Sequence, residues 1–139
     1  MTYIKLFLIA LPIFSLLDFL WLGVIMSDFY RKNLGPLART SGDSLAPYWP
    51  SAIAVYIILV LGAVIFTIPF FKDKPINHWT FLYGALFGFI AYGIYDLTNH
   101  ATLNNWPAKV VIVDMLWGAI IYGTTTYFAA LIARYFNII

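Results

Sequence analysis

Three aspartates lie inside otherwise apolar stretches of the sequence, and they are the residues best suited to do chemistry. Asp18, Asp96 and Asp114 make up half of the six acidic residues of the chain. An unpaired aspartate at mid-membrane costs about 2.5–3.5 kcal/mol on insertion scales, and such residues commonly bind ions, protons or polar groups. What these carboxyl groups can do depends on the elements that position them.

The composition indicates a membrane protein. Of the 139 residues, 63% are hydrophobic and only 10% are charged, whereas soluble domains carry about a quarter charged residues. Four stretches reach the roughly 20 residues that a spanning helix needs, at about 4–26, 50–71, 80–101 and 110–133. We expect an all-α polytopic membrane protein, a single transmembrane domain over residues 1–139, with four helices in an antiparallel bundle and both termini on the same side. The longer loop, 27–49, fits either a short interfacial segment or an ordinary surface loop.

Charge and residue usage exclude several classes of function. The net charge of +2 is too small and too dispersed for nucleic-acid binding, and the absence of cysteine excludes disulfides and thiolate metal sites. Neither the motifs of common hydrolases nor a phosphate-binding glycine loop occurs. The spacing of the acids matches no recognised cation motif, so no metal and no cofactor is predicted. The eight lysines and arginines divide equally between the two sides of the predicted bundle, so they do not indicate its orientation.

The three aspartates are predicted to lie in the same leaflet. At about 1.5 Å per residue, each lies about 8–12 Å from the end of its helix on the side of the loops 27–49 and 102–109. We call this side B and the side of the termini side A. Helical phase at about 100° per residue places aromatic or polar partners near each acid. These are Trp21 beside Asp18, Tyr92, Asn99 and His100 beside Asp96, and Trp117 beside Asp114.

We expect a polar pocket between the first, third and fourth spans, open toward side B. The predicted ligand-binding residues are Asp18, Trp21, Tyr92, Tyr95, Asp96, Asn99, Asp114 and Trp117. Because like charges at close range cannot all ionise cheaply, at least one carboxyl should keep a proton unless His100 or a loop cation neutralises it. The pattern Asp-x-Leu-Trp at 18–21 and again at 114–117 places acid and indole one turn apart. Each indole N–H can therefore serve a carboxylate on a neighbouring helix.

Three functions remain open from the sequence. The protein binds or translocates a small polar ligand, a cation or a proton, and transport would require a homodimer because four helices enclose little volume. Alternatively, it is a membrane-embedded enzyme acting on a lipid or other hydrophobic substrate, although no catalytic residue can be assigned. In the third reading it is a structural or accessory subunit whose acids hold the helices together. Gly84-x-x-x-Gly88, a close-packing motif, could face the second span or another copy of the protein.

Three runs of residues also carry a family resemblance. They are Leu17-Asp18-Phe-Leu-Trp21-Leu22-Gly23, Ala91-Tyr92-Gly93-Ile-Tyr95-Asp96-Leu97-Thr98-Asn99, and Val113-Asp114-Met-Leu-Trp117-Gly118. Together they resemble the signature of domain-of-unknown-function family 2177, small predicted bacterial membrane proteins. The resemblance implies a four-helix protein of the bacterial inner membrane. It implies no activity, and His100 departs from its pattern.

Overall fold

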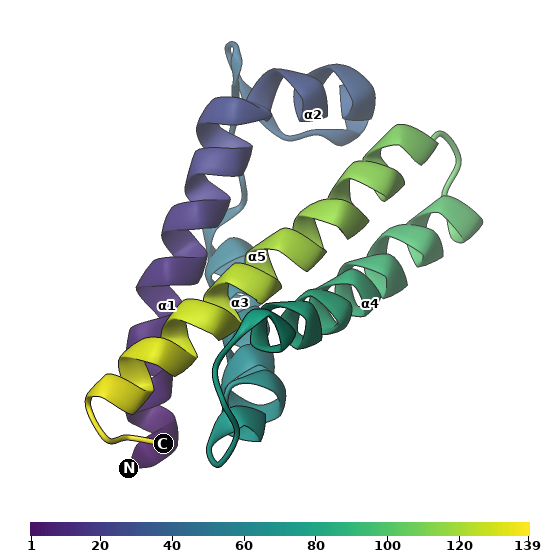
Figure 1. The fold of residues 1–139 in the computed structure, drawn as a ribbon. Helices are drawn as coiled ribbons and strands as arrows, with labels where there is room; N and C mark the ends of the chain where they lie inside the picture. The colour runs from purple at the N-terminus through teal and green to yellow at the C-terminus, as the bar shows by residue number, and fades with distance from the viewer.

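Four helices long and apolar enough to cross a membrane make up most of the computed structural model, which describes all residues 1–139. They cover Thr2–Ile25, Trp49–Phe71, His78–Thr102 and Ala108–Tyr135, and each end lies within two residues of the predicted one. The all-α transmembrane class predicted from the sequence is thus confirmed. The N- and C-termini lie at the same end of the molecule, as predicted (Figure 1).

The first two spans are not uniform α-helices. In the first, α1 (Thr2–Leu20) continues as a π-helical segment, η1 (Trp21–Ile25). In the second, α3 (Trp49–Gly62) continues as the π-helical segment η3 (Ala63–Thr67) and the 3₁₀ turn η4 (Pro69–Phe71). Short π-helical insertions are rare and often occur at functional sites. The first of them begins at Trp21, next to the predicted cluster of acids.

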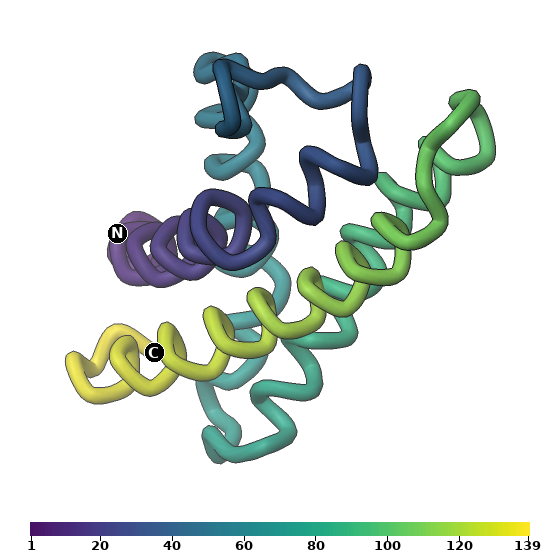
Figure 2. Tube along the Cα trace, turned by 90° about the horizontal axis from the view of Figure 1, so that it is seen from above, coloured from purple at the N-terminus to yellow at the C-terminus, as the bar shows by residue number.

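The third and fourth spans form a close helical hairpin. They are α4 (His78–Thr102) and α5 (Ala108–Tyr135), which lie side by side along their length (Figures 1 and 2). Gly84 and Gly88 face α5, where Gly88 meets the backbone of Gly118 and Gly84 meets the backbone of Tyr122. The expectation that this glycine ridge packs on the second span or on another copy was therefore wrong. The ridge allows two backbones of the same chain to approach closely.

The core is built around α5. Buried side chains of α1, the second span and α5 form one cluster, which includes Phe14, Val64, Ile121 and Tyr122. Large apolar side chains such as Leu8, Phe19 and Ile94 remain exposed on the outside of the helices, where the acyl chains of a bilayer would cover them.

The loop between the first two spans is partly helical and reaches toward the hairpin. It contains α2 (Ser27–Leu34), the 3₁₀ turn η2 (Gly35–Leu37) and a hairpin of two short strands, β1 (Thr40–Ser41) and β2 (Ser44–Leu45). Figure 2 shows the chain leaving the end of α1, running across toward α5 and returning to α3. The Arg31 guanidinium pairs with Asp28 at 2.9 Å and with Asp43 at 2.8 Å. The first pair lies within α2, and the second connects α2 to the strand hairpin on side B.

Candidate functional site

Asp18 joins three helices through hydrogen bonds. Its carboxyl lies on α1 and is only 6% exposed. One oxygen accepts from the indole Nε1 of Trp117 on α5 at 2.8 Å, and the other accepts from the hydroxyl of Tyr56 on α3 at 2.7 Å. Both carboxyl oxygens therefore have donors, which is what a charged group buried among apolar helices needs.

A pair of stacked indoles connects Asp18 to Asp114. The rings of Trp21 and Trp117 lie parallel, with centroids 4.3 Å apart and an interplanar angle of 3°. The Trp21 Nε1 donates to the Tyr30 hydroxyl at 3.0 Å, and that hydroxyl donates in turn to Asp114. Each indole therefore serves the acid of the other Asp-x-Leu-Trp pattern, Trp117 directly and Trp21 through Tyr30. The predicted bond from an indole to a carboxylate on a neighbouring helix is thus present for Trp117, whereas Trp21 donates to a tyrosine hydroxyl.

Asp96 differs from the other two acids because it has no hydrogen-bond donor. Its side chain is completely buried on α4, and neither carboxyl oxygen makes a hydrogen bond. It lies beside Asp114 and the Trp106 indole, whose buried N–H also lacks a partner. Nearly all buried polar groups in proteins are hydrogen-bonded, so this carboxyl is the unusual feature of the cluster.

Two of the predicted ligand-binding residues lie away from the carboxyl groups. Tyr95 is 59% exposed on the outside of α4, where its ring meets Trp106 edge-on. It precedes Asp96 by one residue and is therefore turned about 100° from it around the helix. Asn99 lies near Tyr95, and no hydrogen bond connects its side chain to the acids. His100 is exposed, and its Nδ1 lies 3.0 Å from the Trp106 carbonyl oxygen, where it holds the loop after α4.

The other predicted residues come together. Tyr92 packs against Gly118 and meets the Tyr122 ring edge-on, with centroids 6.4 Å apart. It joins Asp18, Trp21, Asp96, Asp114 and Trp117 in one cluster, which we call the aspartate cluster. Asp18 and Asp96 are buried, whereas Asp114 is partly exposed. Tyr30 of α2 contacts Asp114 on side B, where an opening was expected.

Two residues of the site were not predicted from the sequence, namely Tyr30 and Tyr56. Tyr56 is the one tyrosine of the second span and lies among aliphatic residues, and its hydroxyl was the available signal. Tyr30 is the one buried residue of α2. A buried intramembrane acid requires a hydrogen-bond donor, and the loop 27–49 lies on the same side as the acids. This requirement was the available signal for Tyr30.

A lateral groove of about 550 Å³ lies between α1 and α3. Its lining is apolar except for Ser15 and Tyr56, and no aspartate lines it. Because Tyr56 also donates to Asp18, the groove borders the aspartate cluster through this one side chain.

The family comparison agrees with the resemblance seen in the sequence. The model of a family described as "Predicted membrane protein (DUF2177)" matches residues 3–131, nearly the whole chain. The chain belongs to this family. Neither the curated proteins nor the solved structures gave a match. In this DUF2177 protein the matched region contains all three intramembrane acids and both indoles of the stack.

The Tyr30 hydroxyl of this DUF2177 protein should resist ionisation. Burial raises its pKa above the usual value of 10.0, and the negative charge of Asp114 raises it further. The folded state therefore holds this proton more tightly than the unfolded state does. The resulting stabilisation is present below about pH 10 and lost as the pH rises above it.

Titration of tyrosinate absorbance tests this expectation. Between neutral pH and about pH 11, folded wild type and folded Tyr30→Phe should show the same total absorbance change, because Tyr30 does not ionise in that range. After unfolding in denaturant, the variant should lose the signal of one tyrosine. A difference of one tyrosine between the two folded proteins would mean that Tyr30 is not buried against Asp114.

Proposed function

We propose that this protein reversibly binds a proton, or a small cation in its place, between Asp96 and Asp114 within the membrane. The observation that carries the proposal is the completely buried Asp96 carboxyl, which has no hydrogen-bond donor and lies beside a second acid. An ionised carboxyl in that position would lose its hydration without compensation. A single shared proton removes one negative charge and turns one carboxyl into a donor for the other.

The surroundings of the pair support binding from side B. Asp114 receives its hydrogen bond from Tyr30, and α2, which carries Tyr30, lies on that side with the charged residues Arg31 and Lys32. Asp114 is partly exposed, and a rotation of the Tyr30 side chain would open it further to the aqueous phase. Toward side A the buried polar groups are hydroxyls, and Thr67 and Thr126 bond one another at 2.7 Å. These features favour a binding role over passage across the whole membrane.

Infrared spectroscopy of the carboxyl groups tests the proposal, with Asp96→Asn and Asp114→Asn as the central variants. Wild type should show a protonated carboxyl band at neutral pH that Asp96→Asn removes or shifts. Asp96→Asn should also leave the free energy of unfolding unchanged or raise it by up to about 1 kcal/mol, because a neutral amide replaces an acid that has no donor. Asp114→Asn should shift the band, since it changes the neighbour that shares the proton.

Asp43→Asn is the matched control, because Asp43 is 99% exposed and pairs with Arg31 outside the spans. It should leave the band unchanged. Absence of a protonated band at neutral pH, together with a loss of more than about 2 kcal/mol in Asp96→Asn, would contradict proton binding and assign Asp96 to helix packing.

A second candidate function is the binding or conversion of a lipid-like molecule. The lateral groove between α1 and α3 supports it, because a hydrophobic ligand there would contact Tyr56, whose hydroxyl bonds Asp18. If the carboxyl bands of Asp96 and Asp114 do not respond to pH, this candidate becomes the stronger one.

A further inference from the structure

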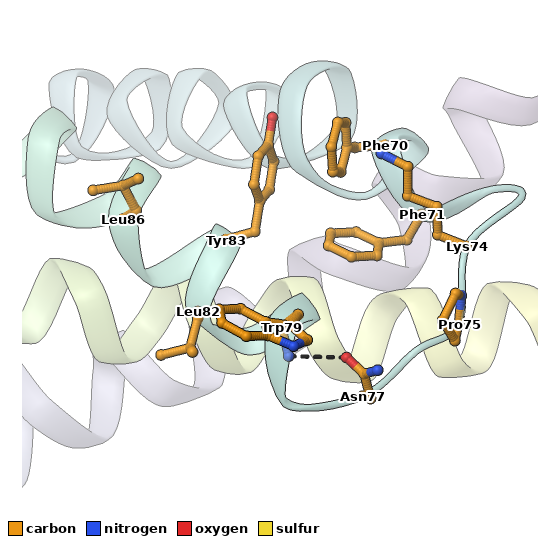
Figure 3. A pocket seen from close by; sticks show the side chains of 9 residues that line it. All are labelled: Phe70, Phe71, Lys74, Pro75, Asn77, Trp79, Leu82, Tyr83 and Leu86. Carbon is orange, nitrogen blue, oxygen red and sulfur yellow. Dashed lines mark hydrogen bonds between the residues drawn. The ribbon is translucent and has the colours of Figure 1, made fainter.

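A second groove lies near the side-A end of the molecule, away from the aspartate cluster. It has a volume of about 450 Å³ and is formed by η4, the following loop and the first turns of α4. Six of its nine lining residues are hydrophobic, and none is acidic. Figure 3 shows Leu86 at one end of the groove and Lys74 at the other.

The Lys74 side chain folds back over the groove and has no acidic partner. Its Nζ lies 3.0 Å from the centroid of the Phe70 ring. The Phe70 ring is also stacked on Tyr83, with centroids 4.3 Å apart (Figure 3). The only ion pairs in the protein are those of Arg31 on side B. The ammonium group of Lys74 therefore meets an aromatic face instead of an anion.

Further positive charge surrounds the same end of the groove. Lys72 is exposed in the adjoining loop. Arg134, in the last turn of α5, donates to the carbonyl oxygens of Phe71 and Lys72 at 2.5 and 2.9 Å. Asp73 is the one acid in this loop. The side-A rim thus holds three cations and one acid, all near the ends of membrane spans.

We propose that this groove binds one anionic phospholipid of the side-A leaflet, with an acyl chain along Leu82 and Leu86 and the phosphate at Lys74. The groove is apolar toward the middle of the membrane and positive at its outer end, which matches the two parts of such a lipid. Trp79, exposed at the start of α4, lies at the level where indoles meet lipid headgroups. Basic residues at pockets between membrane helices are a recurring way of holding anionic headgroups.

Native mass spectrometry of the detergent-solubilised protein tests the proposal, with phosphatidylglycerol and phosphatidylcholine of identical acyl chains as the two probes. Wild type should retain phosphatidylglycerol about fivefold better than phosphatidylcholine. Lys74→Gln should reduce this preference to near equality. Comparing the two lipids within each variant removes any effect of the lost contact with Phe70 on basal stability.

Two further variants separate the headgroup contact from the groove itself. Lys109→Gln, which removes a cation on side B, should keep the full preference. Leu86→Trp fills the apolar end of the groove at an exposed position and should lower the retention of both lipids. The proposal is overturned if wild type retains both lipids equally, if Lys74→Gln behaves like Lys109→Gln, or if Leu86→Trp retains both lipids as wild type does.

Discussion

Replacing Gly88 with alanine should force α4 away from α5 and lower the free energy of unfolding by about 3 kcal/mol. A Cβ at this position would overlap the carbonyl oxygen of Gly118 and would lie 2.6 Å from its carbonyl carbon and 2.7 Å from Tyr122 Cβ. Most of these atoms belong to backbone, so no flexible side chain can move aside. The helices would have to separate, and the packing around Tyr92 and Trp117 would open with them.

Gly23→Ala is the matched control for this substitution. The nearest atom to a Cβ at Gly23 is a ring carbon of Phe19 at 3.6 Å, which is an ordinary contact. We expect Gly23→Ala to be neutral or mildly stabilising, since alanine favours helical backbone over glycine. The fraction of protein that remains monodisperse after heating in detergent measures both variants. Equal stability of the two would contradict the close contact between α4 and α5.

The second large effect is expected at Asp18, where leucine and asparagine should give different results. Asp18→Leu leaves the Trp117 N–H and the Tyr56 hydroxyl buried without an acceptor, at about 1–3 kcal/mol each. Asp18→Asn should lose less than about 1 kcal/mol. The amide oxygen can accept from Trp117, and the amide nitrogen can donate to Tyr56, whose hydroxyl rotates to accept.

Unfolding titrations of the two variants in a denaturing detergent measure this difference. Asp96→Leu is the informative comparison. Asp96 receives no hydrogen bond, so replacing it with leucine leaves no donor without its acceptor. It should lose less stability than Asp18→Leu. If Asp18→Leu proves as stable as Asp18→Asn, the three-helix junction at Asp18 does not hold the fold together.

The spans and the convergence of the acids could be predicted because both depend on the position of residues along a helix of fixed rise. Apolar length predicts a spanning segment, and the distance of Asp18, Asp96 and Asp114 from the helix ends predicts their depth. Which helix faces which could not be predicted in the same way. Apolar residues occupy most of the surface of each span, so hydrophobicity does not distinguish the lipid side from the protein side.

The residues that were missed or misplaced illustrate that limit. Tyr95 was expected in the pocket, yet it lies on the outer face of α4. Tyr30 and Tyr56 come from the long loop and the second span, and only the folded arrangement shows that they supply the donors for Asp114 and Asp18. The partner of the Gly84–Gly88 ridge likewise depended on the fold, because a stripe of small residues does not identify the backbone that will contact it.

The hydrogen bonds of the aspartate cluster all connect separate elements. Asp18 on α1 is bonded from α3 and α5, and Asp114 on α5 is bonded from α2. A proton added to either acid weakens a junction between helices, and a shift between helices changes how firmly that acid holds its proton. By thermodynamic reciprocity these two effects have the same magnitude. The cluster therefore couples the protonation of its acids to the relative positions of the helices. A molecule that binds and displaces one helix would change the charge of an acid on another.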